Sequence, residues 1–169
     1  LHLHPLTIIG HSLGGTVSLH YAGAYPQKVA RLVAVEGLGP PPQLIRERLQ
    51  RPIWERIDAW IEQVRGLSAR QARRYPSIDA AAARMREENA SLSEEQARHL
   101  TVHGVARNED GSFSWKFDNA SRPLFPQRLP PGMLERLWQR IDCPTLLVHG
   151  SDGWHGDPEK DGRAAHIAK

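Results

Sequence analysis

Residues 6–15 read LTIIGHSLGG, and this stretch decides the fold. Its first four residues are apolar or small, as in a short strand that is buried on both faces of a parallel sheet. The residues from Leu13 to Tyr25 have the composition of a helix, which Pro26 would stop. The sequence therefore predicts a strand, a sharp turn centred on Ser12 and a helix.

The spacing Gly10-x-Ser12-x-Gly14 is that of a nucleophile elbow, in which a serine sits on a tight turn from strand to helix. We expect Ser12 to adopt a strained backbone conformation, and both glycines to be needed because side chains there would collide with the crossing chain. The free N–H groups at the helix start would face a developing oxyanion, with the Leu13 amide as one donor. His11 is expected to shape the pocket. No lysine follows the glycines, as a phosphate-binding P-loop would require.

Two further apolar runs, Val29–Val35 and Thr145–His149, predict strands of the same sheet, so the fold class is α/β with parallel strands and crossover helices. Between them lies a segment of different character that begins near three consecutive prolines. Helical spacing, a capping box and an Asp-Gly turn predict a mostly helical insertion. Its helices are expected at 53–64, at 77–89, from 93 onward and at 134–141, and a β-hairpin is expected at 105–117. We therefore divide the chain into 1–38, an insertion at 39–142 and a return to the sheet at 143–169.

Composition narrows the class of protein. The net charge of the 169 residues is only +3, and acidic residues interleave with the arginines of residues 46–86, which argues against a nucleic-acid surface. Cys143 is the only cysteine, so no intrachain disulfide can form, and we expect a buried structural thiol in a cytoplasmic protein. No apolar run approaches the roughly 20 residues that span a bilayer.

In LTIIGHSLGG, VARLVAVEG and CPTLLVHGSD the chain resembles the α/β-hydrolase family, over essentially its whole length. The resemblance implies part of an eight-stranded, mostly parallel sheet, with the insertion at 39–142 as a helical lid packed over the strand ends. It also implies a Ser–acid–His triad in which Ser12 attacks a carboxylic ester or related small acyl substrate through an acyl-enzyme, without cofactor or metal. A carbon–carbon hydrolase or haloperoxidase on the same fold, and a non-catalytic binding protein, are the alternatives.

The triad acid has three candidates. In the family it usually stands three residues after the glycine that ends the late strand, but that position here is Gly153. Asp152 lies one residue earlier and Asp157 four later, in a loop where carboxylates often cap turns. Glu36 ends the strand after the elbow, where some family members place their acid. Asp152 and Glu36 are the leading candidates, ahead of Asp157.

The triad base is the greater problem. The family histidine follows the last strand, and none of His149, His155 and His166 stands in that position. We therefore expect the chain to be an internal fragment that lacks the base and is inactive by itself. His99 and His103 are spaced as a helical metal pair, but no third ligand accompanies them, so no metal site is predicted.

Overall fold

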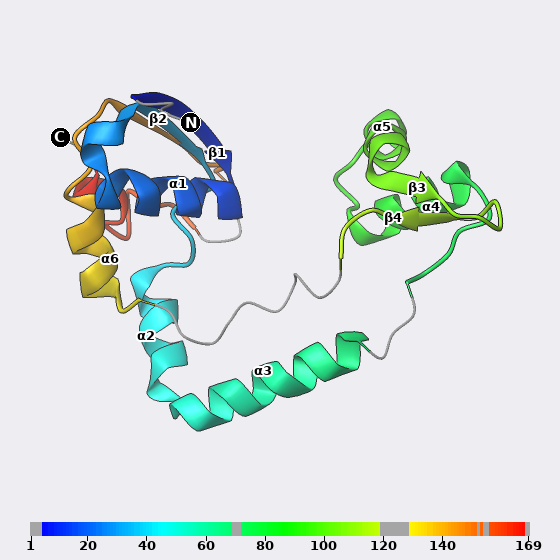
Figure 1. Ribbon diagram of the computed structural model, residues 1–169, viewed down its shortest axis with the longest axis horizontal. Helices are drawn as coiled ribbons and strands as arrows, with labels where there is room; N and C mark the ends of the chain where they lie inside the picture. The colour runs from blue at the N-terminus through cyan, green and yellow to red at the C-terminus, as the bar shows by residue number, and fades with distance from the viewer. Residues whose placement is uncertain (1–4, 69–71, 119–128, 152, 154–155, 168–169) are drawn as a thin grey trace. The chain divides into compact units, whose positions relative to one another are not determined.

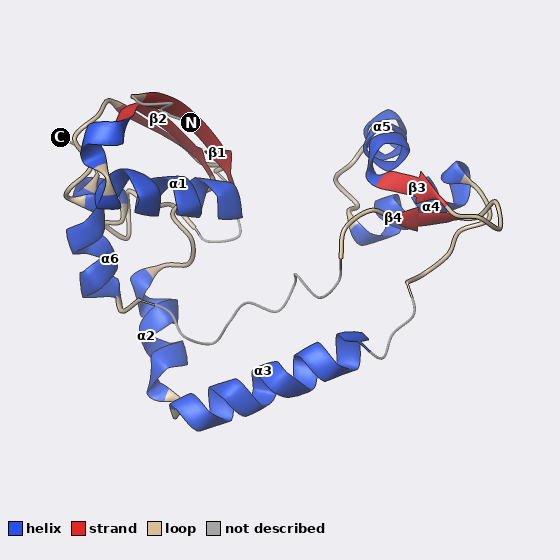
Figure 2. Ribbon diagram, viewed as in Figure 1, coloured by secondary structure: helices blue, strands red, loops and turns tan. Residues whose placement is uncertain are grey.

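The computed structural model describes residues 5–68, 72–118, 129–151, 153 and 156–167. The chain divides into two compact units: Leu1–Ile53 together with Gln127–Lys169, and Trp54–Pro126. The elements of each unit are drawn in Figure 1 and coloured by type in Figure 2.

The first unit contains the sheet, in which β1 (Leu6–His11), β2 (Val29–Val35) and β5 (Thr145–Val148) run parallel in the order β1-β2-β5. These are the three strands that the apolar runs predict. The register pairs His11 with Val35 and Val35 with Val148, so the three strands end at the same level. Residues that directly follow them are therefore brought together at one edge of the sheet.

The helices of this unit are α1 (Leu13–Ala24), η1 (Pro26–Lys28), α2 (Pro42–Gln50), α6 (Pro131–Trp138) and η3 (Ala164–His166). Two details differ from the sequence prediction. Proline at the first helical position starts α2 where only a boundary was expected, and it starts α6 at Pro131. The short 3-10 turn η3 follows Gly162, whose φ of 81° lies outside the helical region.

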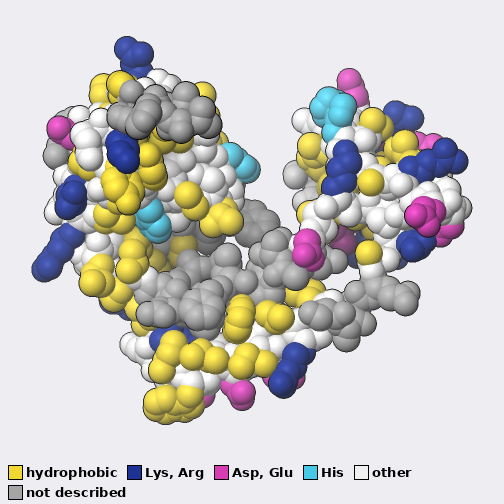
Figure 3. Space-filling model, viewed as in Figure 1, with side chains coloured by type: hydrophobic (Ala, Val, Ile, Leu, Met, Phe, Trp, Pro, Cys, Tyr) yellow, Lys and Arg dark blue, Asp and Glu magenta, His cyan; other side chains and the backbone are white. Residues whose placement is uncertain are grey.

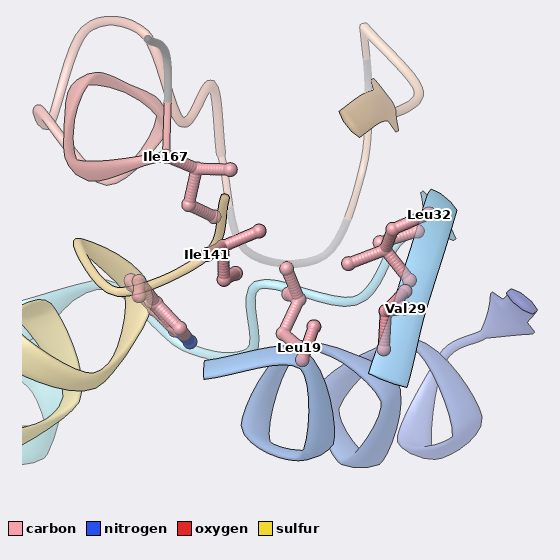
Figure 4. Close-up of a cluster of buried hydrophobic side chains, with 8 residues drawn as sticks. Leu19, Val29, Leu32, Ile141 and Ile167 are labelled. Carbon is pink, nitrogen blue, oxygen red and sulfur yellow. The ribbon is translucent and has the colours of Figure 1, made fainter. Parts of the chain in front are cut away.

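The core of the first unit lies between the sheet and α1 with α6. Leu19 of α1 and Leu32 of β2 are almost completely buried, and Ile141 and Ile167 close the cluster from the C-terminal segments. Figure 4 shows these side chains pointing toward one another from α1, β2 and the later part of the chain. Residues far apart in sequence thus share one core.

The other face of the sheet is more open than the apolar runs suggest. Ile9 of β1 is 74% exposed and Leu146 of β5 is 58% exposed. Both pair with Val33 of β2 in the register, so they lie in one row across the sheet. The expectation that Leu6–Ile9 is buried on both faces is therefore wrong for the chain described here: only the face that carries Leu6 and Ile8 packs toward the core.

The second unit is built from α3 (Ile53–Ser68, assigned to it from Trp54), α4 (Ile78–Glu88), α5 (Glu94–Gly104), β3 (Val105–Arg107) and β4 (Phe113–Trp115). The predicted capping box opens α5: Ser93 Oγ accepts from the Gln96 amide at 3.1 Å, and Gln96 Oε1 accepts from the Ser93 amide at 2.9 Å. β3 and β4 form the predicted antiparallel hairpin. This unit lies within residues 39–142, and its role as a lid stays a prediction.

Candidate active site

Three residues follow the three level strand ends: Ser12 after β1, Glu36 after β2 and His149 after β5. Backbone hydrogen bonds continue the ladder one step beyond the strands. The Ser12 amide donates to the Val35 carbonyl at 2.8 Å, and the Glu36 amide donates to the Val148 carbonyl at 2.8 Å. The carboxyl edge of a parallel sheet is where ligands bind in open α/β folds, and Ser12 and Glu36 follow adjacent strands at this edge.

Ser12 has the conformation predicted for a nucleophile elbow. It is the N-cap of α1 with φ 52° and ψ −118°, outside the regions that ordinary residues prefer. Such a conformation costs on the order of 1–3 kcal/mol and persists only where the surrounding structure imposes it. The first N–H groups of a helix have no partner within the helix, so the amide of Leu13, at the first position of α1, is available at this end.

The glycines of the motif play unequal roles. A Cβ on Gly10 would lie 2.5 Å from the Gly14 carbonyl oxygen, so Gly10 is sterically required. A Cβ on Gly14 would meet nothing within 4 Å, so the expectation that both flanking glycines prevent a clash is wrong for Gly14. The second required glycine is Gly15, whose Cβ would lie 2.7 Å from the Cα of Gly37.

Glu36 is held at several points. Its φ of 51° places it, with Ser12, in the left-handed region; among the described residues no other non-glycine residue has a positive φ. Its Oε1 accepts a hydrogen bond of 2.6 Å from the Gly150 amide, which follows β5 by two residues. A Cβ on Gly153 would lie 3.1 Å from the same oxygen. The carboxylate therefore lies close to both Gly150 and Gly153, where a side chain on Gly153 would crowd it.

A pocket opens beside Glu36 between the residues that follow β2 and β5, and its lining includes His149 and Arg163. The Arg163 side chain is only 3% exposed and forms an ion pair of 2.7 Å with Asp161. Its guanidinium also donates to the carbonyl oxygens of Gly39 and Gly156. This buried arginine joins the chain after β2 to the chain after β5, and the sequence offered no signal for that link, because it ends on the backbone carbonyl of Gly39, which is far away in the sequence.

Of the other acid candidates, Asp152 lies outside the described residues. Asp157 accepts from the Glu159 amide at 2.9 Å, as a turn-capping carboxylate does. It also lies 3.4 Å from Lys160 Nζ and 3.7 Å from His149 Nε2. The backbone hydrogen bond from Glu159, followed by the hydrogen bond from Lys160 and its charge, lowers the pKa of Asp157.

His11 ends β1 and is exposed, on the face of the sheet opposite to the core. No hydrogen bond joins the Ser12 hydroxyl to a histidine among the described residues, where His166 pairs instead with Glu135 at 3.8 Å. In the same part of the chain, no group of three or more histidine, cysteine or acidic side chains is arranged to bind a metal. Likewise, no helix within the described ranges has the length and apolar character of a membrane span.

Comparison with known proteins identifies the fold family of this chain. A family model described as the alpha/beta hydrolase fold matches residues 1–164. The chain belongs to the α/β-hydrolase fold family. The parallel strands β1, β2 and β5 agree with that fold, and the assignment of Ser12 to the family's nucleophile elbow stays a prediction.

Several solved structures share the α/β-hydrolase fold of this chain. A thioesterase domain from the curacin biosynthetic pathway has 23% identity and a TM-score of 0.67, covering 98% of this chain and 57% of that one. A hypothetical protein from Pseudomonas aeruginosa has 21% identity and a TM-score of 0.73, covering 98% and 57%. An esterase from Mycobacterium tuberculosis has 18% identity and a TM-score of 0.61, covering 96% and 49%. The chain thus spans about half the length of these structures. No curated protein matches it significantly.

Proposed function

We propose that the protein containing this chain is a serine hydrolase that cleaves a carboxylic ester or a related acyl compound through an acyl-enzyme, with Ser12 as nucleophile and Glu36 as triad acid. One observation carries the proposal. The only non-glycine residues with positive φ among those described are Ser12 and Glu36, and they follow adjacent parallel strands at the same level. Residues with strained backbone conformations cluster at active sites, so two of them side by side at this edge support a functional site there.

In the proposed reaction the Ser12 hydroxyl oxygen attacks the acyl carbon, and a general base takes the hydroxyl proton. The N–H groups at the start of α1, that of Leu13 first, stabilise the oxyanion of the tetrahedral intermediate. The alcohol or thiol then leaves with the proton from the base, and water hydrolyses the acyl-serine by the same steps. The proposed reaction steps use no cofactor, and the proposed substrate is a small molecule.

The choice of Glu36 over the other acids rests on position. The family's usual acid position is Gly153, which has no carboxylate, and the Glu36 carboxylate lies within van der Waals distance of the point where a Cβ of Gly153 would be. An acid reaching the same place from the neighbouring strand is the simplest replacement. Asp157 caps the turn at Glu159 and lies near Lys160 and His149, which is the turn-capping role expected for a carboxylate in this loop.

The names of two similar structures, a thioesterase domain and an esterase, guide the choice of substrates for a test. The complete gene product should be assayed with p-nitrophenyl esters and acyl thioesters of increasing chain length, and labelled with a fluorophosphonate. We expect Ser12→Ala to abolish labelling, and Glu36→Gln to lower kcat on the order of 10⁴-fold, as loss of a triad acid does.

Matched variants separate the acids and histidines. Asp157→Asn, Asp152→Asn and His149→Gln should each keep most of the labelling rate. If Asp152→Asn or Asp157→Asn instead reproduces the loss, the acid assignment to Glu36 is wrong while the serine mechanism stands. If wild-type protein and Ser12→Ala are labelled to the same extent, Ser12 is not the nucleophile and the whole proposal fails. If neither protein is labelled, a non-catalytic binding role is favoured.

A further inference from the structure

The hydroxyl of Thr16 joins the two halves of the proposed site. Thr16 lies on the first turn of α1, where its amide donates to the Ser12 carbonyl at 3.0 Å. The Oγ1 hydroxyl of Thr16 donates to the carbonyl oxygen of Gly37 at 2.7 Å. The carbonyl oxygen of Ser12 lies farther from this hydroxyl, at 3.4 Å from Thr16 Oγ1. A hydroxyl has one proton to donate, and the shorter contact takes it. Thr16 is thus bonded to the residue directly after Glu36.

The peptide that Thr16 holds determines where Glu36 stands. The Glu36 amide and carboxylate are both fixed from β5, through Val148 and Gly150. From the side of α1 the segment is fixed by the backbone contact between Gly15 and Gly37 and by the Thr16 hydroxyl. The contact with Gly15 is apolar, and it only limits how closely Gly37 can approach α1. The hydrogen bond from Thr16 is the polar link that keeps Gly37 from moving away.

We infer that Thr16 is a positioning residue, which sets the place of the Glu36 carboxylate relative to Ser12 through its hydrogen bond to Gly37. This inference rests on the proposed function. Thr16 touches neither the substrate nor the reacting atoms in this role. Displacement of a catalytic group by about 1 Å lowers rates by as much as 100-fold, so one hydrogen bond at this junction is sufficient to control turnover.

The test compares Thr16→Val, which keeps the shape of the side chain without its hydroxyl, with Thr16→Ser, which keeps the hydroxyl. In the complete gene product we expect Thr16→Val to lower kcat for an ester substrate about tenfold at nearly unchanged KM, and Thr16→Ser to restore most of it. The matched control is Thr101→Val: its hydroxyl also donates to a backbone carbonyl at 2.7 Å, that of Ala97, but within the second unit. We expect Thr101→Val to retain the wild-type kcat.

A double-mutant cycle with Glu36→Gln distinguishes positioning from a merely structural bond. If Thr16 acts through Glu36, adding Thr16→Val to Glu36→Gln lowers kcat no further. Equal losses in both backgrounds, or a Thr16→Val enzyme with wild-type kcat, would overturn the inference while Ser12 and Glu36 keep their roles. If Ser12→Ala retains full labelling or Glu36→Gln retains full turnover, the proposed function fails in that part, and the inference falls with it.

Discussion

The backbones of Gly15 and Gly37 touch, and this contact brings the first turn of α1 against the chain that leaves β2. A Cβ on Gly15 would lie 2.7 Å from the Cα of Gly37, and a Cβ on Gly37 would lie 2.8 Å from the Cα of Gly15. Since both neighbours are backbone atoms, neither position can accept a side chain without moving a main-chain segment. The elbow and the segment that begins at Glu36 are therefore assembled through two glycines.

The first prediction concerns these glycines. We expect Gly15→Ala to destabilise the protein by about 1–3 kcal/mol, the usual effect of overpacking, as measured by urea unfolding. Gly14→Ala is the matched control one residue away, because its Cβ meets nothing within 4 Å and alanine favours the helix. Equal loss of stability in both variants would show that the contact with Gly37 is not what excludes a side chain at Gly15.

The second prediction concerns the core of the first unit. Leu19 is fully buried among α1, the sheet and the segment of α6, and Leu19→Ala should lower the free energy of unfolding by about 2–5 kcal/mol. Val17 lies on the same helix but is 57% exposed, so Val17→Ala should change stability little. The unfolding temperatures of the two variants can be measured by differential scanning calorimetry. Equal decreases in both variants would contradict the packing described here.

The third prediction concerns the buried arginine. Removing one partner of a buried ion pair leaves uncompensated polar groups, so Arg163→Met should cost about 3 kcal/mol in chemical denaturation. Arg84 pairs with Glu87 and Glu88 on the surface of α4, and Arg84→Met should leave the unfolding midpoint nearly unchanged. A neutral Arg163→Met would mean that the links from Arg163 to Gly39 and Gly156 do not stabilise the loops around the pocket.

The fourth prediction is a pH dependence that arises from His20 of α1. Burial lowers the pKa of His20 below its usual 6.5, and within the described chain its Nε2 is buried without a hydrogen-bond partner. The unfolded chain therefore binds a proton at His20 that the folded chain resists. Stability conferred by neutral His20 is complete above pH 6.5, and it is lost as the pH falls from there through the folded pKa. Thermal unfolding between pH 7.5 and 5 should show a shallower pH dependence in His20→Gln, and an unchanged slope would refute this role.

The surface of the second unit bears on partners. Figure 3 shows positive and negative side chains interspersed there rather than gathered by sign. Ion pairs on this unit join Arg65 with Glu62 within α3 and Arg98 of α5 with Asp79 of α4. The sequence predicts that the protein does not bind nucleic acid, and this stays a prediction.

The sequence by itself determined the local features. LTIIGHSLGG contains an apolar strand, a turn and a helix in ten residues, so the strained serine could be predicted without any distant contact. The capping box at Ser93 and the hairpin turn near Gly111 are local in the same sense. In each case the residues that make the structure are neighbours in the chain, and their spacing is enough to identify it.

The tertiary structure decided which residues meet at the site. The sequence left Glu36 and Asp152 as equal leading candidates for the acid, ahead of Asp157. Only the register of β1, β2 and β5 sets Glu36 level with Ser12, with the Gly150 amide bonded to its carboxylate. The roles of Gly15, Thr16 and Arg163 depend on carbonyl and Cα atoms supplied by loops more than twenty residues away. Backbone atoms are the same in every residue, so no side-chain pattern can identify such partners before the chain is folded.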